Sequence, residues 1–436
     1  MSEEPRDRGA VDVAAARDER DGYPGPIIDM RPVPVHPPAT AARSGRSPRW
    51  LSSRWFNSLT VQALIIVVVT RLLLFGLAWF TLRAIPRLPL YPDQLADSFL
   101  PGALWLDGWA RWDTAHYVTV ARHGYGGEGI ASPGGGLGFF PLFPTLMRWT
   151  VQLSGAGMTD ARLAAAAVAI ANACFLVAAP LLAHLTAKRF GDDVARTATL
   201  LLCLSPFSLF FSAGYSESLF LLLVLLAFAA ADRGWWLAAA LCSALVTATR
   251  LVGLALPPAL LLLAWRRGKP RDLVLTALIS PLGALGYMLY TWIAFDDPLA
   301  YFAAQANWGG WQEHVGYYAE LFATMPREGL FGDARHSIIV LNVALALLWL
   351  ASLPAVWRRL DPGIALYTTL MVVVHAAMTW VSLGRYLIVA IGFYPVVALL
   401  LSRPAWRGWP RDLVLIASTL LLAMLTILFS HGFWIV

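Results

Sequence analysis

The 436-residue sequence is poor in charged residues and in cysteine. Only 14% of its residues are Asp, Glu, Lys or Arg, whereas 58% are hydrophobic and the mean hydropathy is +0.61. This balance excludes a soluble globular fold, because such proteins carry about 25% charged residues. Cys174, Cys203 and Cys242 all fall in apolar runs, so we expect three small core residues rather than a disulfide or a zinc site.

The apolar runs also lack the alternation of a transmembrane β-barrel, which excludes that architecture. The stretch from Leu219 to Ala231, for example, is apolar throughout. Runs of about 20 apolar residues cross the hydrocarbon core, and helices satisfy their own backbone hydrogen bonds in lipid. The sequence therefore predicts an all-α polytopic membrane protein.

The chain divides into a polar tail and a long apolar domain. Residues 1–54 have the composition of a disordered tail, and we find no cleavable signal peptide before the first apolar run near Leu59. Residues 55–436 form the predicted transmembrane domain. We place about eleven spans, at 59–82, 160–187, 194–213, 215–231, 235–250, 251–265, 273–295, 336–357, 363–381, 385–402 and 412–433.

Short basic clusters between the runs predict the topology. If residues 139–155 do not cross the membrane, all of the basic clusters, which are named at the end of this paragraph, lie on the same side of the membrane as the N-terminal tail. This is the arrangement that the positive-inside rule requires. We therefore interpret 139–155, which is short and contains Pro141 and Pro144, as a re-entrant or interfacial segment. The net charge of +6 then reflects topology and not nucleic-acid binding. The clusters are Lys188 with Arg189, Arg233, the set Arg266, Arg267, Lys269 and Arg271, Arg358 with Arg359, and Arg403, Arg407 and Arg411.

This topology makes the tail cytoplasmic and puts two long loops outside, at 83–159 and 296–335. Long structured loops on one face commonly carry function. If this part of the first loop forms a helix, one face of the helix carries Asp113, His116 and His123. Trp112 and Tyr117 would then be aromatic anchors at the membrane interface. The alternative is that these polar side chains only face water.

Three further charged residues fall at the outer membrane boundary. Glu217 follows Tyr215 and Ser216 between two spans, where a charge is costly unless it is paired or hydrated. It is either a site residue or an acid in the first turn of a helix capped by Ser216, and the two are compatible. Arg250 has no role in positive-inside sorting, so we expect it to pair with Glu217 or to bind phosphate. Arg385 is either a site residue or a snorkelling helix end.

These residues occur in motifs that resemble the PIG-V mannosyltransferase family. The motifs are Trp112-Asp113-x-x-His116-Tyr117, His123-Gly124-Tyr125, Phe139-Phe140-Pro141-x-Phe143-Pro144, the string from Phe211 to Ser218, and Ala248-Thr249-Arg250. They run in the family's order from about Arg111 to Gly253, and Gly384-Arg385-Tyr386 extends the likeness. Ala115 departs from the pattern, because an acidic residue stands there in the eukaryotic relatives.

The resemblance implies a GT-C type fold and an extracytoplasmic active site. It also implies a polyprenyl-phosphate-mannose donor, an inverting transfer, and Asp113 as general base, with no clear need for a metal. We expect no cofactor and no metal site, and the acceptor should be a glycolipid or a cell-envelope glycan. The Arg-rich tail and the high use of Ala, Arg and Leu predict a bacterial plasma-membrane protein.

The predicted site therefore contains eleven residues. The predicted catalytic residues are Asp113, His116 and Glu217, and the predicted substrate-binding residues are Arg111, Trp112, Tyr117, His123, Tyr215, Ser216, Arg250 and Arg385. A carboxylate would accept the proton of the acceptor hydroxyl, and an arginine would stabilise the departing phosphate. The alternative function is a transporter or flippase of lipid-linked sugar, although the sequence shows no obvious pair of related halves.

Overall fold

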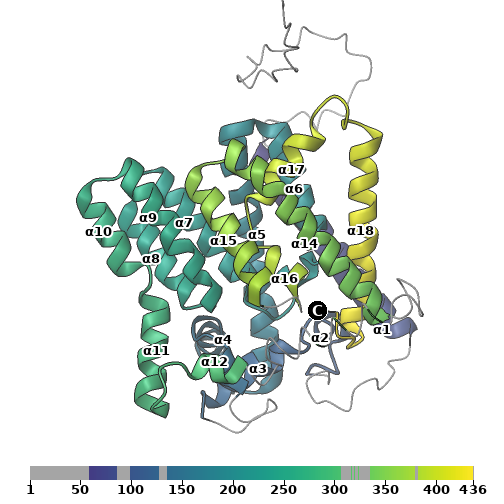
Figure 1. Cartoon of the computed structure of the whole chain (residues 1–436). Helices are drawn as coiled ribbons and strands as arrows, with labels where there is room; N and C mark the ends of the chain where they lie inside the picture. The colour runs from purple at the N-terminus through teal and green to yellow at the C-terminus, as the bar shows by residue number, and fades with distance from the viewer. Residues whose placement is uncertain are drawn as a thin grey trace, which may run out of the picture. The chain divides into compact units, whose positions relative to one another are not determined.

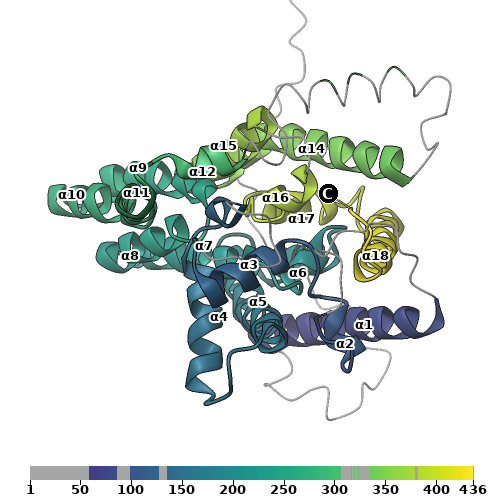
Figure 2. The ribbon, with the colours of Figure 1, turned by 90° about the horizontal axis from the view of Figure 1, so that it is seen from below.

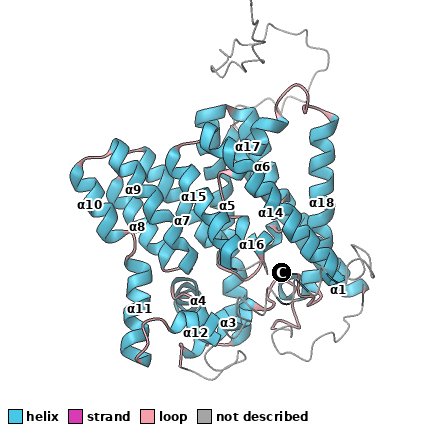
Figure 3. Ribbon diagram, viewed as in Figure 1, coloured by secondary structure: helices cyan, strands magenta, loops and turns pink. Residues whose placement is uncertain are grey.

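The computed structural model describes residues 58–85, 99–126, 135–305, 316, 319, 323, 334–378 and 382–435. Regular structure in this part of the chain is entirely helical (Figure 3), which confirms the all-α prediction. The predicted tail, residues 1–54, lies outside the described residues, as does most of the predicted outer loop beyond residue 305.

Five stretches of the described chain are long and apolar enough to cross a membrane. They lie in α1 (Leu59–Ala84), α5 (Asp160–Phe190), α14 (Ala334–Arg359) and α18 (Trp409–Ser430), and in the pair α10 (Pro270–Ile279) and α11 (Leu282–Phe295). The chain is therefore an integral membrane protein with several spans (Figure 1). The predicted count of about eleven spans is not confirmed.

The remaining apolar runs form shorter helices that pack among the long ones. These are α6 (Asp192–Leu204), α7 (Glu217–Asp232), α8 (Trp236–Thr247), α9 (Leu256–Arg267), α15 (Pro362–Met378), α16 (Leu383–Leu387) and α17 (Phe393–Leu401). A short 3₁₀ turn, η5 (Leu251–Ala255), joins α8 to α9. One large hydrophobic core connects the long and the short helices.

Several spans predicted as continuous helices are interrupted, and the span at 273–295, for example, divides at Ser280 and Pro281 into α10 and α11. The prediction of one helix over 194–213 is wrong, because Pro206 keeps Ser205 extended, at φ −52° and ψ 139°, and α6 ends at Leu204. The prediction of one helix over 385–402 is also wrong. Residues 388–392 are not helical and separate α16 from α17, and Pro395 lies in the first turn of α17, where a missing N–H is tolerated.

The described part of the first predicted outer loop is mostly helical. It contains α2 (Leu104–Asp107), α3 (Asp113–His123), η3 (Gly135–Gly138) and α4 (Leu142–Leu153). Figure 1 shows α4 nearly end-on, whereas Figure 2 shows its length, so α4 lies across the bundle rather than along it. Trp149 and Leu153 on α4 are exposed. Both observations fit an interfacial segment.

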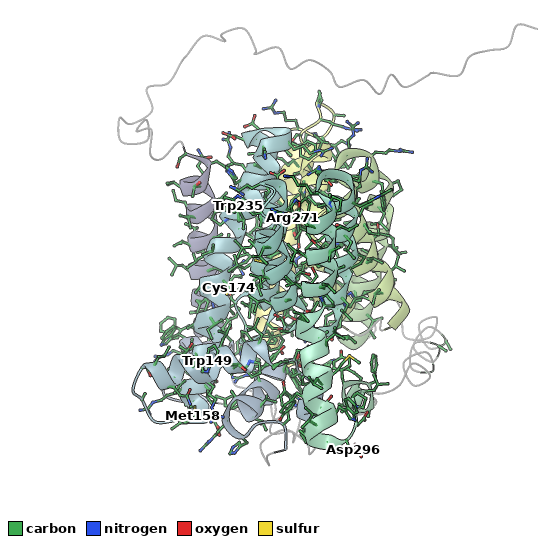
Figure 4. The ribbon with its side chains drawn as sticks, turned by 90° about the vertical axis from the view of Figure 1, so that its left-hand side faces the viewer. Trp149, Met158, Cys174, Trp235, Arg271 and Asp296 are labelled. Atoms are coloured by element: carbon green, nitrogen blue, oxygen red, sulfur yellow. The ribbon has the colours of Figure 1, made fainter. Side chains whose placement is uncertain are left out.

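Several of the basic clusters lie at one end of the bundle. Figure 4 shows Trp235 and Arg271 toward one end and Trp149, Met158 and Asp296 toward the other. An ion pair of Lys188 with Asp232 joins the ends of α5 and α7, and one of Arg267 with Asp361 joins the end of α9 to the α14–α15 connection. These basic clusters therefore share one end, which we call the basic end. Helices α3 and α4 lie toward the opposite end (Figure 1).

Candidate active site

Four charged side chains from distant parts of the chain meet in one linked cluster. Arg385 Nη2 lies 2.7 Å from Asp113 Oδ2, and Arg385 Nε lies 2.5 Å from Glu217 Oε1. Arg250 Nη1 lies 2.5 Å from the same Glu217 oxygen. The cluster is neutral overall, because two carboxylates balance two guanidinium groups. The structure thus brings together the four residues that the sequence predicted to converge.

Burial differs sharply within this cluster. The Glu217 and Arg385 side chains are only 1% and 3% exposed, whereas those of Asp113 and Arg250 are 19% and 16% exposed. Glu217 Oε2 has no hydrogen-bond partner among the described residues. Buried charges are stable only when paired, so Arg385 and Glu217 form the interior of the cluster and Asp113 and Arg250 form its accessible rim.

Aromatic rings enclose the Arg385 guanidinium. Its Cζ lies 4.4 Å from the Tyr215 ring centroid, 5.2 Å from that of Phe210 and 5.4 Å from that of Tyr386. The Tyr386 ring also packs 4.9 Å from the Arg250 Cζ. Such cation–π contacts are stronger where water is excluded. The snorkelling interpretation of Arg385 is therefore wrong, since the side chain points into the protein.

A strained backbone turn directs Asp113 toward the cluster. Trp112 directly precedes α3 and has φ 51°, a conformation that costs a non-glycine residue about 1–3 kcal/mol. The Trp112 indole packs edge-on against Trp434, with the ring centroids 5.0 Å apart. The Asp113 N–H donates to Tyr215 Oη at 3.3 Å. Asp113 is thus held by its backbone and by Arg385, while Oδ1 makes no hydrogen bond among the described residues.

The segment between α6 and α7 presents Tyr215 and Ser216 to α3, and Glu217 follows as the first residue of α7. Ser216 precedes α7 but its side chain caps no backbone N–H, so that part of the capping prediction is wrong. Its hydroxyl instead lies 2.8 Å from Tyr117 Oη. Burial raises the pKa of Tyr117, which keeps this phenol protonated. Glu217 does lie in the first turn of α7, as predicted.

An arginine that the sequence analysis missed holds this segment in place. Arg71, buried in α1, donates to the carbonyl oxygens of Cys203 and Ser208 at 2.6 and 2.9 Å, and to the hydroxyls of Ser208 and Ser212 at 3.0 and 3.4 Å. Asn172 on α5 accepts from the Ser212 hydroxyl at 2.9 Å. An arginine inside an apolar span was the signal that could have identified it.

His375 on α15 is a second residue that the sequence analysis missed. Its ring is buried and stacks on Tyr386 with a centroid separation of 4.8 Å. Together with Glu217, Arg250 and Arg385 it lines a pocket of about 10 Å³, which is about the space that one water needs. The space enclosed beside the buried part of the cluster is therefore that of about one water molecule.

Three predicted site residues lie away from the cluster. Arg111 is fully buried and pairs with Asp107 at 2.6 Å, which fixes the turn before α3. His116 is buried and stacks on Phe139, with the ring centroids 4.7 Å apart. His123 is exposed at the far end of α3. The roles of these three residues stay predictions.

No group of three or more His, Cys, Asp or Glu side chains in the described part of the chain is arranged to hold a metal ion. The three cysteines are free thiols. The expectation that the protein needs no metal or cofactor stays a prediction.

Comparison with known proteins identifies the segment that carries most of this cluster. Residues 54–260 match the family model described as Mannosyltransferase (PIG-V). GPI alpha-1,6-mannosyltransferase 2 of Cricetulus griseus is 34% identical over 208 residues, which cover 44% of this chain and 41% of that protein. The Homo sapiens protein of the same name is 32% identical over 177 residues, which cover 39% and 33%. This chain thus spans less than half the length of these relatives.

The fold also has distant likenesses among solved structures. ArnT from Cupriavidus metallidurans bound to undecaprenyl phosphate is 15% identical with a TM-score of 0.43, covering 85% of this chain and 76% of that one. The Archaeoglobus fulgidus oligosaccharyltransferase in its apo form is 16% identical with a TM-score of 0.46, covering 88% and 56%. The family resemblance predicted from the motifs is confirmed for residues 54–260, which hold Asp113, Glu217 and Arg250 and are similar to the PIG-V mannosyltransferases.

Proposed function

We propose that this protein is a GT-C type glycosyltransferase that transfers mannose from a polyprenyl-phosphate-mannose donor to a lipid-linked or cell-envelope glycan. The observation that carries the proposal is the linked cluster of Asp113, Arg385, Glu217 and Arg250. A partly exposed carboxylate beside a partly exposed guanidinium provides a base and an anion-binding group. Transfer from a lipid phosphate needs both.

Asp113 has the geometry of a general base. Its Oδ2 is fixed by Arg385, which leaves Oδ1 for the hydroxyl of an acceptor. In the proposed reaction the acceptor oxygen forms a bond to the anomeric carbon while the bond from that carbon to the phosphate oxygen breaks. The hydroxyl proton moves to Asp113, and the electron pair leaves with the polyprenyl phosphate. A single displacement of this kind inverts the anomeric centre.

Arg250 is the residue that we assign to the phosphate of the donor. It uses Nη1 to bind Glu217, and its other N–H groups have no partner among the described residues. A guanidinium presents several N–H donors in a plane, which suits phosphate oxygens. We assign Glu217 as the residue that positions both arginines, because one of its oxygens accepts from each of them.

The proposed orientation places the basic end in the cytoplasm and the cluster on the opposite side of a bacterial plasma membrane. The support is the positive-inside rule together with the shared position of the basic clusters at one end of the bundle. The donor would then enter from the leaflet nearest to α3, and the acceptor from the aqueous side.

A membrane assay with several polyprenyl-phosphate sugars tests the proposal. The lipid fraction would be analysed by mass spectrometry, and only the mannose donor is expected to give a hexose-bearing product. Asp113→Asn should lower transfer by about 10²- to 10⁴-fold at equal membrane content. The matched control is Asp160→Asn, because Asp160 forms a partly exposed ion pair with Arg122 outside the cluster.

Two outcomes would contradict the proposal. Full transfer by the Asp113→Asn variant would remove this residue from the mechanism. Movement of a labelled lipid-linked sugar across liposomes without any transfer would favour the flippase alternative instead.

A further inference from the structure

A cavity of about 280 Å³ lies at the basic end, away from the charged cluster. Its walls come from α5, α7, α9, α15, α17 and the α14–α15 connection, which meet in the upper half of Figure 1. Protein interiors leave few voids larger than a water molecule. A space of this size between helices therefore indicates a place for a bound molecule.

The cavity changes in polarity from its mouth inward. Along α5, Arg189 lies at the mouth, Thr186 lies about one turn deeper and Leu182 lies about one turn deeper still. On α7, Asp232 lies at the mouth and Leu225 lies inside. A charged mouth, a polar middle and an apolar interior match the headgroup, ester and acyl chain of a phospholipid.

The charges at the mouth favour an anion. Lys188 pairs with Asp232, and Arg267 pairs with Asp361. Arg189 forms no ion pair among the described residues and is repelled by the like charge of Arg267. The lining residues therefore carry three cations and two carboxylates, so one positive charge remains uncompensated.

Thr186 gives an independent indication of a ligand. Its side chain is buried, with 3% of its surface exposed, and its hydroxyl has no hydrogen-bond partner in the described part of the chain. Leaving a buried hydroxyl without a partner costs about 1–3 kcal/mol. Its oxygen is covered by neighbouring atoms, so a rotation of the side chain would bring the hydroxyl to an ester or phosphate oxygen inside the cavity, which would accept its hydrogen bond.

We propose that this cavity binds one anionic phospholipid of the adjacent leaflet, with its phosphate at Arg189, its ester region at Thr186 and an acyl chain against Leu182 and Leu225. Free phosphate does not fit the mostly apolar walls. Basic pockets between transmembrane helices are places where anionic headgroups bind. The proposal does not depend on the transferase reaction.

Native mass spectrometry of the full chain, purified in detergent and mixed with equal amounts of phosphatidylglycerol and phosphatidylcholine, tests this proposal. We expect one phosphatidylglycerol per chain, retained about tenfold better than phosphatidylcholine, which corresponds to 1.4 kcal/mol. Arg189→Ala should remove this preference and Thr186→Val should weaken retention. Leu185→Trp, which fills the cavity from a half-buried position, should reduce retention of both lipids.

Arg266→Ala is the matched control, because Arg266 lies beside Arg267 in the chain but does not line the cavity. It should leave retention unchanged. Equal losses for the Arg189 and Arg266 variants would show only surface attraction and would overturn the proposal. Equal retention of the two lipids by the unmodified protein, undiminished binding by the Leu185→Trp variant, or displacement of the lipid by inorganic phosphate alone would overturn it as well.

Discussion

Replacing Glu217 by glutamine separates the positioning role that we assign to Glu217 from the base role that we assign to Asp113. The Glu217 carboxylate is almost fully buried and accepts two bonds of 2.5 Å from Arg385 and Arg250. Glutamine keeps the shape but removes the charge that balances these two guanidinium groups. Breaking a buried ion pair costs about 3–5 kcal/mol.

The corresponding change at Asp113 should cost much less stability. Asp113 is about one-fifth exposed and makes a single ion pair, of 2.7 Å, with Arg385. A partly exposed charged hydrogen bond contributes about 1–2 kcal/mol. In a chain of this size each kcal/mol lowers the melting temperature by at most about 2 °C, so we expect losses of roughly 5 °C for Glu217→Gln and roughly 2 °C for Asp113→Asn.

Activity should follow the opposite order. Asp113→Asn removes the proton acceptor and should lower the turnover rate by about 10²- to 10⁴-fold. Glu217→Gln leaves the base in place and should mainly raise the KM for the donor, because Arg250 loses its anchor. Thermal unfolding in detergent at one fixed scan rate and steady-state transfer in membranes measure the two quantities.

The reasoning fails if the two variants exchange their effects. A Glu217→Gln variant with normal thermal stability and no turnover would make Glu217 the proton acceptor. An Asp113→Asn variant that unfolds 5 °C lower while retaining turnover would make Asp113 a structural residue.

Three further predictions concern residues that hold or extend the cluster. Arg250→Lys keeps the charge but loses the planar set of donors, so the KM for the donor should rise about tenfold and the KM for the acceptor should stay constant; equal changes in both would argue against a phosphate role. Gly384→Ala should lower transfer at least about 10²-fold by displacing Arg385, because the added Cβ would lie 2.2 Å from the Phe207 ring. Adding Phe207→Leu should restore part of that activity, and an unaffected Gly384→Ala enzyme would contradict the packing argument. Arg71→Met should lower thermal stability by several degrees and turnover together, because four hydrogen bonds are lost; a loss of turnover at normal stability would mean that Arg71 contacts substrate.

The sequence predicted the charged cluster better than it predicted the helices around it. Asp113, Glu217, Arg250 and Arg385 were identified because a charge at a membrane boundary needs a partner, and each of them has one. The same rule applies to Arg71, which was overlooked because its span was assigned from average hydropathy alone. A single charged residue inside an apolar run is thus a more specific sequence signal of a residue that needs a buried partner than the apolar run itself.

The helix breaks were harder to predict because hydropathy does not register them. The runs at 194–213 and 385–402 are mostly apolar, yet α6 ends at Leu204 before Pro206, and residues 388–392 separate α16 from α17. The ion-pair partner of Arg111 could not be predicted from the sequence either. Its neighbour Asp107 lies one helical turn before it, in a segment with no evident periodicity.

These breaks explain how a neutral cluster of four charges is stable inside a membrane bundle. Irregular backbone is tolerated at membrane depth only where protein covers it or where it lines a cavity. Asp113 and Glu217 are the first residues of α3 and α7, Arg250 precedes the 3₁₀ turn η5, and Arg385 lies in the five-residue helix α16, so every charge is supplied next to a helix break. Such segments need their own hydrogen-bond donors, and Arg71 donates four hydrogen bonds to the end of α6 and to the segment that leads from it to Glu217. The apolar spans therefore carry the chain across the bilayer, whereas the buried arginines bind the segments that depart from these spans to form the site.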